Sequence, residues 1–266
     1  MKIGICIGVV GKDNQTPDVS RLEAIRRIGY DYAELGVAQV MALSEESFNT
    51  VLGALKAIGL PCPCLNGFLP GTIRLTGPEA DLDAAQEYAK KAFARVQALG
   101  AGVIVFGSGG ARNLPGDFPL ADGLNQVAAF LAAIADSAQA HHIAIAIEPL
   151  NRMESNILNR VSEAVALARR VNHPAIGVLA DTYHMNLSYE PMDNIVDAAP
   201  WLQHVHVART LGRRLPAARD GEDYGKAFEA LARAGYDRTL SMEASAQVDF
   251  EREAADALRL MRSLAG

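Results

Sequence analysis

The chain has 266 residues, of which half are hydrophobic and 21% are charged, and its formal net charge is -6. An acidic chain without a Lys/Arg-rich block is a poor candidate for binding nucleic acid, because phosphate-backbone binding depends on basic patches. No segment approaches the roughly 20 consecutive apolar residues of a membrane span, so we expect no nucleic-acid partner and no membrane insertion.

Short runs rich in β-branched residues alternate with longer stretches of Ala, Leu, Glu and Arg along the whole chain. The short runs predict strands at residues 3–9, 31–35, 62–66, 102–106, 143–147, 176–180, 204–207 and 239–242. The longer stretches predict helices at residues 18–28, 45–58, 79–98, 121–140, 160–171, 192–198, 225–234 and 249–264. Several predicted helices are followed by a glycine that can end them, as at Gly29 and Gly59.

Eight strand–helix repeats predict an α/β fold with a parallel sheet, because each helix carries the chain back to start the next strand. The strands are continuously apolar rather than alternating, which indicates burial on both faces. A (β/α)₈ barrel, or TIM barrel, has about 250 residues. We therefore predict a single barrel domain over residues 1–266. The alternative is an open, doubly wound sheet, although the first strand is not followed by a Gly-x-Gly-x-x-Gly turn.

The three cysteines, Cys6, Cys62 and Cys64, are too few and too unevenly spaced for a disulfide framework. Reduced thiols are typical of cytoplasmic proteins. The apolar segment 3–10 is short, contains two glycines and lacks the features of a signal peptide. The sequence therefore predicts a cytoplasmic location.

Four residues with metal-binding side chains lie at the ends of four successive predicted strands: Glu148, Asp181, His206 and Glu243. Any one of them alone is better explained as a helix cap or a solvated loop residue. In a closed barrel, however, these four positions converge at one rim. Three carboxylates and one imidazole suit one divalent metal ion, with Mn²⁺ as our first choice and Mg²⁺, Co²⁺ or Zn²⁺ also compatible.

The other histidines divide by position. His184 lies three residues after Asp181 and is a candidate for binding substrate or the metal. His204 lies two residues before His206, deeper in the barrel, and is predicted to be a hydrogen-bonded core residue. At predicted helix ends that precede strands, on the opposite face, lie His141, His142 and His173.

Six arginines lie in predicted loops after strands: Arg74, Arg112, Arg152, Arg209, Arg213 and Arg214. Most arginines are solvated, but one or two in such loops can clamp a hydroxyl, carboxylate or phosphate of a substrate. Arg112 and Arg213 are among the candidates for this role. The glycine-rich segment 107–110 offers backbone N–H groups to an anion, a feature shared by many glycine-rich loops.

Four motifs carry a resemblance to a known superfamily. They are Ile147-Glu148-Pro149-Leu150-Asn151-Arg152, Asp181-Thr182-Tyr183-His184-Met185-Asn186, His204-Val205-His206-Val207 and Met242-Glu243. With these motifs the chain resembles the sugar phosphate isomerase/epimerase superfamily, the xylose-isomerase-like barrels, and within it the ketose 3-epimerases.

The resemblance implies roles for individual residues. Glu148, Asp181, His206 and Glu243 match the residues that bind one Mn²⁺-type ion, and the two glutamates match the acid/base pair. Glu154 and His184 match substrate-binding residues. Arg213 matches the family's arginine after the strand-7 histidine only if one residue is inserted, so Arg214 is the alternative at this position.

These residues predict a metal-dependent isomerase or epimerase that acts on a ketose or a related small keto-sugar through an enediolate. The alternative is a metal-dependent dehydratase of a keto-polyol or a cyclic keto acid. A sugar-binding barrel without turnover and a DNA-repair endonuclease are further alternatives. The endonuclease would need additional histidines on the early strands, but strand 3 ends in Asn66. The expected partner is a small carbohydrate, and a homo-oligomer is compatible with the sequence.

Overall fold

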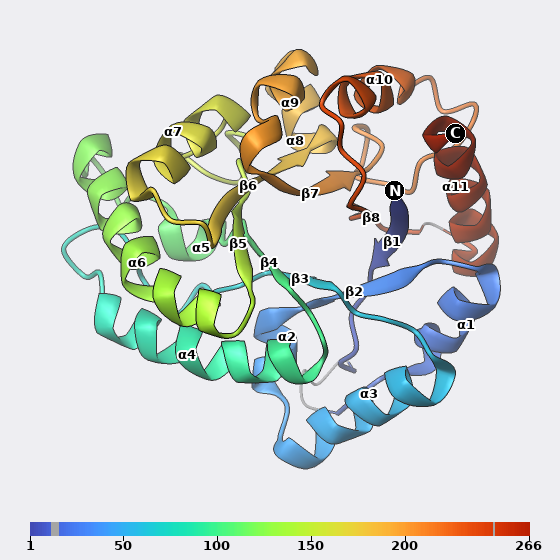
Figure 1. The fold of residues 1–266 in the computed structure, drawn as a ribbon, viewed down its shortest axis with the longest axis horizontal. Coiled ribbons are helices and arrows are strands. Elements are labelled where there is room, and N and C mark those ends of the chain that lie inside the picture. The colour runs from blue at the N-terminus through green and yellow to red at the C-terminus, as the bar shows by residue number, and fades with distance from the viewer. Residues whose placement is uncertain (12–15, 247) are drawn as a thin grey trace.

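The structure is a computed structural model that describes residues 1–11, 16–246 and 248–266. In this part of the chain eight strands pair in sequence order, each parallel to the next. β1 also pairs in parallel with β8, and this pairing closes the sheet into a barrel. Figure 1 shows the strands in the middle of the molecule, with the helices in a ring around them. The predicted (β/α)₈ barrel is confirmed, and the open sheet is wrong because each of the eight described strands pairs on both sides.

All eight predicted strands are present. They are β1 (Lys2–Cys6), β2 (Tyr32–Gly36), β3 (Cys64–Asn66), β4 (Val103–Phe106), β5 (Ala144–Ile147), β6 (Ile176–Asp181), β7 (Leu202–Val207) and β8 (Thr239–Met242). The first strand ends three residues earlier than predicted. The shortest is β3, where two prolines precede the strand and cannot donate ladder hydrogen bonds.

The eight predicted helices are also present. They are α1 (Ser20–Ile28), α3 (Glu45–Ile58), α4 (Leu82–Ala98), α6 (Leu120–Ala140), α7 (Val161–Val171), α9 (Asp193–Asp197), α10 (Gly225–Arg233) and α11 (Phe250–Ala265). The cap of α3 shows how the sequence sets these bounds. Ser44 Oγ accepts the Ser47 N–H at the start, and Gly59 takes a left-handed φ of 63° at the end.

Four short helices were not predicted. They are α2 (Val37–Ala42), α5 (Gly109–Arg112), α8 (Thr182–Leu187) and the 3₁₀ helix η1 (Ala199–Trp201). α2 and α8 directly follow β2 and β6, and α5 is separated from the end of β4 by two residues, so all three lie on the rim where the strands end. No helix in the described ranges is both long enough and apolar enough to cross a membrane.

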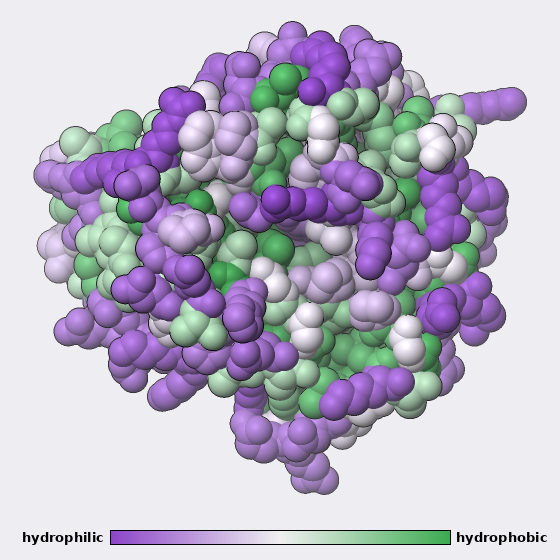
Figure 2. All heavy atoms as spheres, viewed as in Figure 1, coloured by the Kyte–Doolittle hydropathy of each residue, from purple (hydrophilic) through white to green (hydrophobic). Residues whose placement is uncertain are grey.

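The core has an outer and an inner part. The outer part packs strand residues such as Ile5, Phe106 and Ile147 against the helices. A separate, smaller apolar cluster of Val105, Ala146 and Leu179 lies on the other face of the sheet, inside the barrel. In Figure 2 hydrophilic residues cover most of the outer rim of the face in view, and hydrophobic residues show mainly between them toward the centre.

The other side of the barrel interior is polar. Glu34 of β2 and His204 and His206 of β7 are completely buried. β2 and β7 are not neighbours in the sheet, because β1 and β8 lie between them. The contacts between Glu34 and the two histidines therefore cross the inside of the barrel. They form a buried polar network that extends from the interior to His206, near the rim.

The register brings the predicted metal-binding residues to the same end of the barrel. Asp181, the last residue of β6, pairs with His206 of β7. His206 in turn pairs with Ser241 of β8, so Glu243 lies two residues farther along, just past the end of this strand. Phe106 pairs with Ile147, so Glu148 follows β5 at the end of the β4–β5 pair. Parallel strands in a closed barrel all end at one rim, and these side chains therefore meet there.

Candidate metal centre

The four predicted metal-binding residues form one compact group. Glu148, Asp181, His206 and Glu243 each offer a ligand atom, and these atoms all lie within 4.8 Å of one another. The side chains of Glu148, Asp181 and His206 are buried, and that of Glu243 is partly buried. A group of this size, with one donor from each residue, has the dimensions of a mononuclear metal site.

The ring of His206 has a defined orientation. Its Nδ1 lies 3.3 Å from Glu148 Oε1 and 3.3 Å from Glu243 Oε2. Its Nε2 lies 3.0 Å from Glu34 Oε1 on the opposite side of the ring. Nδ1 is therefore the nitrogen that faces the carboxylates of the rim, and Nε2 is held from inside the barrel.

The two carboxylate oxygens of Asp181 differ in their hydrogen bonding. Its Oδ1 accepts the Tyr183 N–H at 2.8 Å and caps α8. Its Oδ2 is buried and makes no hydrogen bond, with the guanidinium of Arg213 and the ring of His184 each 3.5 Å away. A buried carboxylate oxygen without a hydrogen bond is costly, and a cation would satisfy it. Three carboxylates and one imidazole fit a hard or borderline divalent ion, so the residues present fit the metal that the sequence predicts.

The charges of the group depend on one another. Burial by itself would raise the pKa of Glu243, but His206 and Arg213 hold it at about 2. Burial raises the pKa of Asp181, with support from the charge of Glu148 and against the effect of His184. Burial disfavours the imidazolium form of His206, yet Glu34, Cys6 and Glu243 together raise its pKa well above the ordinary value. Positive charge from His206 and Arg213 thus balances the carboxylates.

The two candidate arginines, Arg213 and Arg214, lie in different surroundings. The guanidinium of Arg213 bonds Glu243, lies 3.4 Å from Glu154 Oε2 and covers the ring of Tyr183 at 4.7 Å. Arg214 is exposed, and its backbone pairs with Arg209 and Ser245. Arg213 has a left-handed φ of 47°, next to Gly212 with a φ of 81°. This turn directs Arg213, and not Arg214, toward the metal-binding group.

His184 and Glu154 lie beside the group through Asn151. His184 Nδ1 accepts the backbone N–H of Asn151 at 3.1 Å, so its proton is at Nε2. That Nε2 lies 3.5 Å from Asp181 Oδ2. The side-chain amide of Asn151 donates to Glu154 Oε1 at 2.9 Å. Asn151 belongs to the quoted Glu-Pro motif, but the sequence did not assign it this linking role.

Arg112 does not lie where a substrate could reach it. Its side chain is completely buried. Its guanidinium donates to the carbonyl oxygens of Phe106 at 2.8 Å and Glu148 at 2.6 Å. The prediction that Arg112 binds substrate does not fit this position. The arginine instead joins the ends of β4 and β5 and fixes the backbone that carries Glu148.

Two further polar side chains near the group were missed by the sequence analysis. Asn66 Nδ2 donates to Glu243 Oε1 at 3.1 Å. Glu34 accepts from both histidines of β7. The only available signal for Glu34 was an acidic residue inside an apolar strand, which is also typical of a strand with one solvated face.

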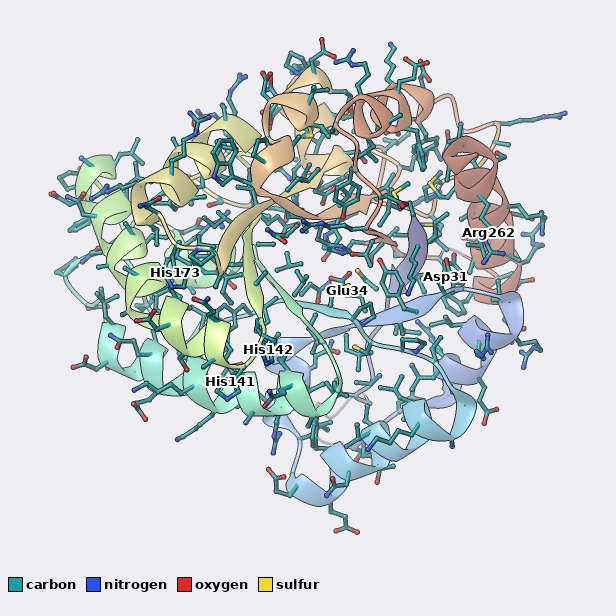
Figure 3. The ribbon with its side chains drawn as sticks, viewed as in Figure 1. Asp31, Glu34, His141, His142, His173 and Arg262 are labelled. Atoms are coloured by element: carbon teal, nitrogen blue, oxygen red, sulfur yellow. The ribbon has the colours of Figure 1, made fainter. Side chains whose placement is uncertain are left out.

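The remaining histidines lie as predicted. His204 is buried, with its Nε2 2.8 Å from Glu34 Oε2 and its Nδ1 2.8 Å from Thr239 Oγ1, which confirms a hydrogen-bonded core residue. In Figure 3, His141, His142 and His173 lie among helix ends, away from Glu34 in the middle of the barrel.

A cavity of about 380 Å³ opens beside the metal-binding group. It is lined by Cys6, Ile7, Gly8, Gly36, Gln39, Asn66, Arg213, Glu243, Ala244 and Ser245. Amide, guanidinium and carboxylate groups give this cavity both hydrogen-bond donors and acceptors. Such a lining suits a small polyhydroxylated molecule.

Comparison with known proteins agrees with this geometry. A family model described as "Xylose isomerase-like TIM barrel" matches residues 22–264. A ketose 3-epimerase of Arthrobacter globiformis is 29% identical over 250 residues, which cover 91% of this chain and 83% of that protein.

Two solved structures share the fold. A D-psicose 3-epimerase of Clostridium cellulolyticum H10, solved with D-tagatose, has a TM-score of 0.87 and 20% identity, with coverage of 100% of this chain and 99% of that one. A 3-keto-D-glucoside 4-epimerase of E. coli has a TM-score of 0.83 and 20% identity, with coverage of 99% of both chains. At this level of identity the two structures demonstrate the common architecture alone.

Proposed function

The chain belongs to the xylose isomerase-like TIM barrel family, and on that premise we propose that it is a divalent-metal-dependent epimerase or isomerase of a ketose or a related small keto-sugar. The observation that carries this proposal is the group of four ligand atoms from Glu148, Asp181, His206 and Glu243 within 4.8 Å of one another. The similarity to a ketose 3-epimerase along 91% of the chain supports it.

In this proposal Glu148, Asp181, His206 and Glu243 hold the cation, with Mn²⁺ as the first choice. When bound, the cation supplies electrostatic stabilisation for the negative charge of the enediolate that forms as the substrate loses a proton. The buried Asp181 Oδ2, which has no hydrogen-bond partner, supports this assignment.

Glu148 and Glu243 are the proposed acid/base pair. The C–H bond next to a ketone is weakly acidic, and one carboxylate takes its proton while the electron pair moves toward the carbonyl oxygen. The other glutamate, in its protonated form, returns a proton to the opposite face of the same carbon in an epimerase. Return to the adjacent carbon gives aldose–ketose isomerisation. The two glutamates then exchange their protons with water, which restores the starting state.

Three side chains beside the pair are the proposed substrate-binding residues: His184, Glu154 and Arg213. His184 Nε2 carries a proton and can donate to a substrate oxygen, because its Nδ1 already accepts from Asn151. Arg213 donates to an oxygen from the cavity side, and Glu154 accepts from a hydroxyl. The mixture of donors and acceptors supports a polyhydroxylated substrate.

The remaining proposals concern the cellular compartment and the binding partners of the protein. All three cysteines are free thiols, which supports the reducing cytoplasm as its compartment. A small carbohydrate is the proposed partner, and a homo-oligomer stays a prediction.

The experiment that tests this function is proton NMR in D₂O with the Mn²⁺-loaded and the metal-stripped protein. The substrates are a panel of free and phosphorylated ketoses and aldoses. We expect deuterium at C3 of a ketose, and only with metal, for a 3-epimerase. Deuterium at C1 or C2 would identify an isomerase, and loss of water would identify the dehydratase alternative. No exchange in any substrate despite bound metal would contradict the proposal and favour a barrel that binds without turnover.

The acid/base pair has its own test in the same assay. Glu148→Gln and Glu243→Gln should each lower the exchange rate by about 10²-fold or more, because general acid–base catalysis contributes about 10²–10⁴-fold. Circular dichroism should show that both variants keep the fold. Exposed Glu46→Gln on α3 serves as the control and should exchange at the wild-type rate. Near-wild-type exchange in both site variants would contradict the two-carboxylate mechanism.

A further inference from the structure

We propose that Glu34 is a positioning residue for the metal centre: its carboxylate fixes the proton of His206 at Nε2 and thereby keeps Nδ1 free to bind the cation. The proposal rests on the metal site of the proposed function. Glu34 lies on β2, and none of the four motifs quoted above includes it.

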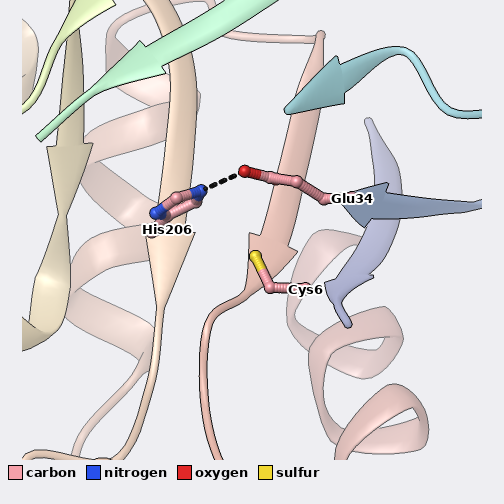
Figure 4. A group of neighbouring side chains, drawn as sticks. All are labelled: Cys6, Glu34 and His206. Atoms are coloured by element: carbon pink, nitrogen blue, oxygen red, sulfur yellow. Dashed lines mark hydrogen bonds and ion pairs between the residues drawn. The ribbon is translucent and has the colours of Figure 1, made fainter. Parts of the chain in front are cut away.

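The contact is direct, short and buried. Glu34 Oε1 lies 3.0 Å from His206 Nε2, and both side chains are completely buried. Figure 4 shows the carboxylate of Glu34 reaching from β2 to the ring of His206, with Cys6 of β1 beside them. Because β2 and β7 are not adjacent in the sheet, this bond spans the barrel interior. The orientation of the His206 ring is therefore set by this side-chain contact and not by backbone pairing between β2 and β7.

The chemistry of a carboxylate gives the bond a direction. An ionised carboxylate only accepts hydrogen bonds, so His206 donates to Glu34 from Nε2. A cation that binds at Nδ1 displaces any proton there and leaves a neutral imidazole with a single N–H, and with that proton held at Nε2 the lone pair is at Nδ1. Nδ1 is the nitrogen that lies 3.3 Å from both Glu148 and Glu243. A carboxylate behind a histidine ligand is a common device for fixing its tautomer and raising its basicity.

Glu34 is itself held from its other oxygen. His204 Nε2 donates to Glu34 Oε2 at 2.8 Å, and the thiol of Cys64 donates to the same oxygen at 3.3 Å. His204 Nδ1 then accepts the hydroxyl of Thr239 at 2.8 Å. Glu34 Oε2 thus accepts from two buried donors, His204 and Cys64. These hydrogen bonds hold the carboxylate in the orientation in which Oε1 faces His206. The buried network therefore converges on Glu34 and reaches the metal-binding group through His206.

Removal of Glu34 should affect metal binding differently depending on whether Glu34 has a purely structural role or positions His206. If Glu34 only satisfies two buried histidines, its removal costs stability and leaves the affinity of the folded protein for metal unchanged. If it positions His206, its removal weakens metal binding even in the folded protein. Replacement of residues that support a metal ligand typically costs about 10–100-fold in metal affinity.

The test measures Mn²⁺ binding by the EPR signal of the free ion and uses the visible spectrum of bound Co²⁺ as a report on coordination. For Glu34→Leu we expect the Kd for Mn²⁺ to rise about 10–100-fold and the Co²⁺ spectrum to change. Glu34→Gln should lie between this variant and the wild type, because its amide oxygen can still accept from His206 but carries no charge. Neither readout requires a sugar substrate.

Tyr32→Phe is the matched control. Tyr32 lies on the same strand, two residues before Glu34, and its buried hydroxyl bonds Ser241 Oγ at 2.8 Å. This variant loses a buried hydrogen bond of the barrel interior that does not reach His206. It should lower the unfolding temperature but leave the Kd for Mn²⁺ and the Co²⁺ spectrum unchanged.

The outcomes separate this proposal from the proposed function. Unchanged Mn²⁺ affinity in folded Glu34→Leu overturns the role of Glu34 while the metal site stands. Should Glu34→Leu not fold, a wild-type Kd for Glu34→Gln overturns it equally. Absence of Mn²⁺ binding by the wild-type protein overturns both. An equal loss of affinity in Tyr32→Phe would assign the effect to general disturbance of the barrel and would also overturn the proposal.

Discussion

At the scale of single residues, Arg213 carries more interactions with the site than any other cation described near it. It bonds Glu243, approaches Glu154 and Asp181, and covers Tyr183. In the proposed function it also donates to the substrate. Hydrogen bonds that involve a charged group contribute about 1.5–3 kcal/mol, and we therefore expect Arg213→Ala to raise KM roughly 10- to 100-fold.

The neighbouring Arg214 is a natural control for this prediction, because its side chain is exposed and its described role is in backbone pairing. Arg214→Ala should keep the KM of the wild-type protein. Steady-state kinetics of both variants at saturating Mn²⁺ provide the comparison. Equal losses in the two variants, or a loss confined to Arg214→Ala, would show that the left-handed turn at Arg213 does not present the substrate-binding arginine.

The sequence could identify site residues whose role follows from their position at the end of a strand. Asp181 and His206 stood out because each ends or nearly ends an apolar run, and the barrel then brings such positions together. Glu34 could not be recognised in this way, because its partners lie on a strand 170 residues away and across the barrel. Arg112 was misassigned for a related reason: only the structure shows its guanidinium turned back toward the carbonyl oxygens of Phe106 and Glu148.

At the scale of elements, the end of β4 is shaped to admit Glu148. A Cβ atom on Gly107, the residue after β4, would lie 2.2 Å from Glu148 Oε2. The colliding atom is the end of a flexible side chain, so the barrel can absorb the change, but the carboxylate must leave its position. We expect Gly107→Ala to keep the fold and to weaken Mn²⁺ binding by 10-fold or more, in line with the roughly 10–100-fold effect of disturbing a ligand's support.

Gly102, directly before the same strand, is the matched control. A Cβ atom there would meet its nearest neighbour, the carbonyl oxygen of His142, at an ordinary 3.5 Å. Gly102→Ala should bind Mn²⁺ as the wild-type protein does, which calorimetric titration of both variants would establish. Wild-type affinity in Gly107→Ala would mean that Glu148 does not need its described position to bind the ion.

The elements also show where sequence patterns reach their limit. Several of the helices that join one strand to the next have a side-chain cap at the start, as α3, α4 and α11 do, and α3 was predicted with the bounds that the structure gives it. The helices α2, α5 and α8 have six, four and six residues. Isolated helices shorter than about 12–15 residues are marginal in water, so their sequences carry little helical signal. Tertiary contacts form them instead, as when Asp181 caps α8.

At the scale of the whole molecule, closure of the barrel fixes the site. β1 pairs with β8, and α11 returns beside α1, where Tyr30 donates to the Ala254 carbonyl oxygen at 2.8 Å. Arg262 of α11 also donates to the Gly29 carbonyl oxygen at 2.6 Å and approaches Asp31, as Figure 3 shows. The repeat count predicted this closure, but the pairing of the first and last strands is a contact between distant segments. Closure of the barrel places Glu34 of β2 across the interior from the proposed metal ligands, which follow or end β5 to β8.

Because the four ligands come from strands at separate points of one closed barrel, the proposed ion should stabilise the entire fold. A ligand present at 100 times its Kd stabilises the folded state by about 2.7 kcal/mol. In a chain of this size 1 kcal/mol corresponds to about 2–4 °C, so saturating Mn²⁺ should raise the unfolding temperature by about 5–10 °C. Scanning calorimetry with Mn²⁺ and then with excess chelator measures the shift. Asp181→Asn should lose most of it, whereas Asp117→Asn, an exposed loop residue, should retain it. An identical shift in both variants would place the stabilising ion elsewhere, and no shift in the wild type would remove the metal from the proposed function.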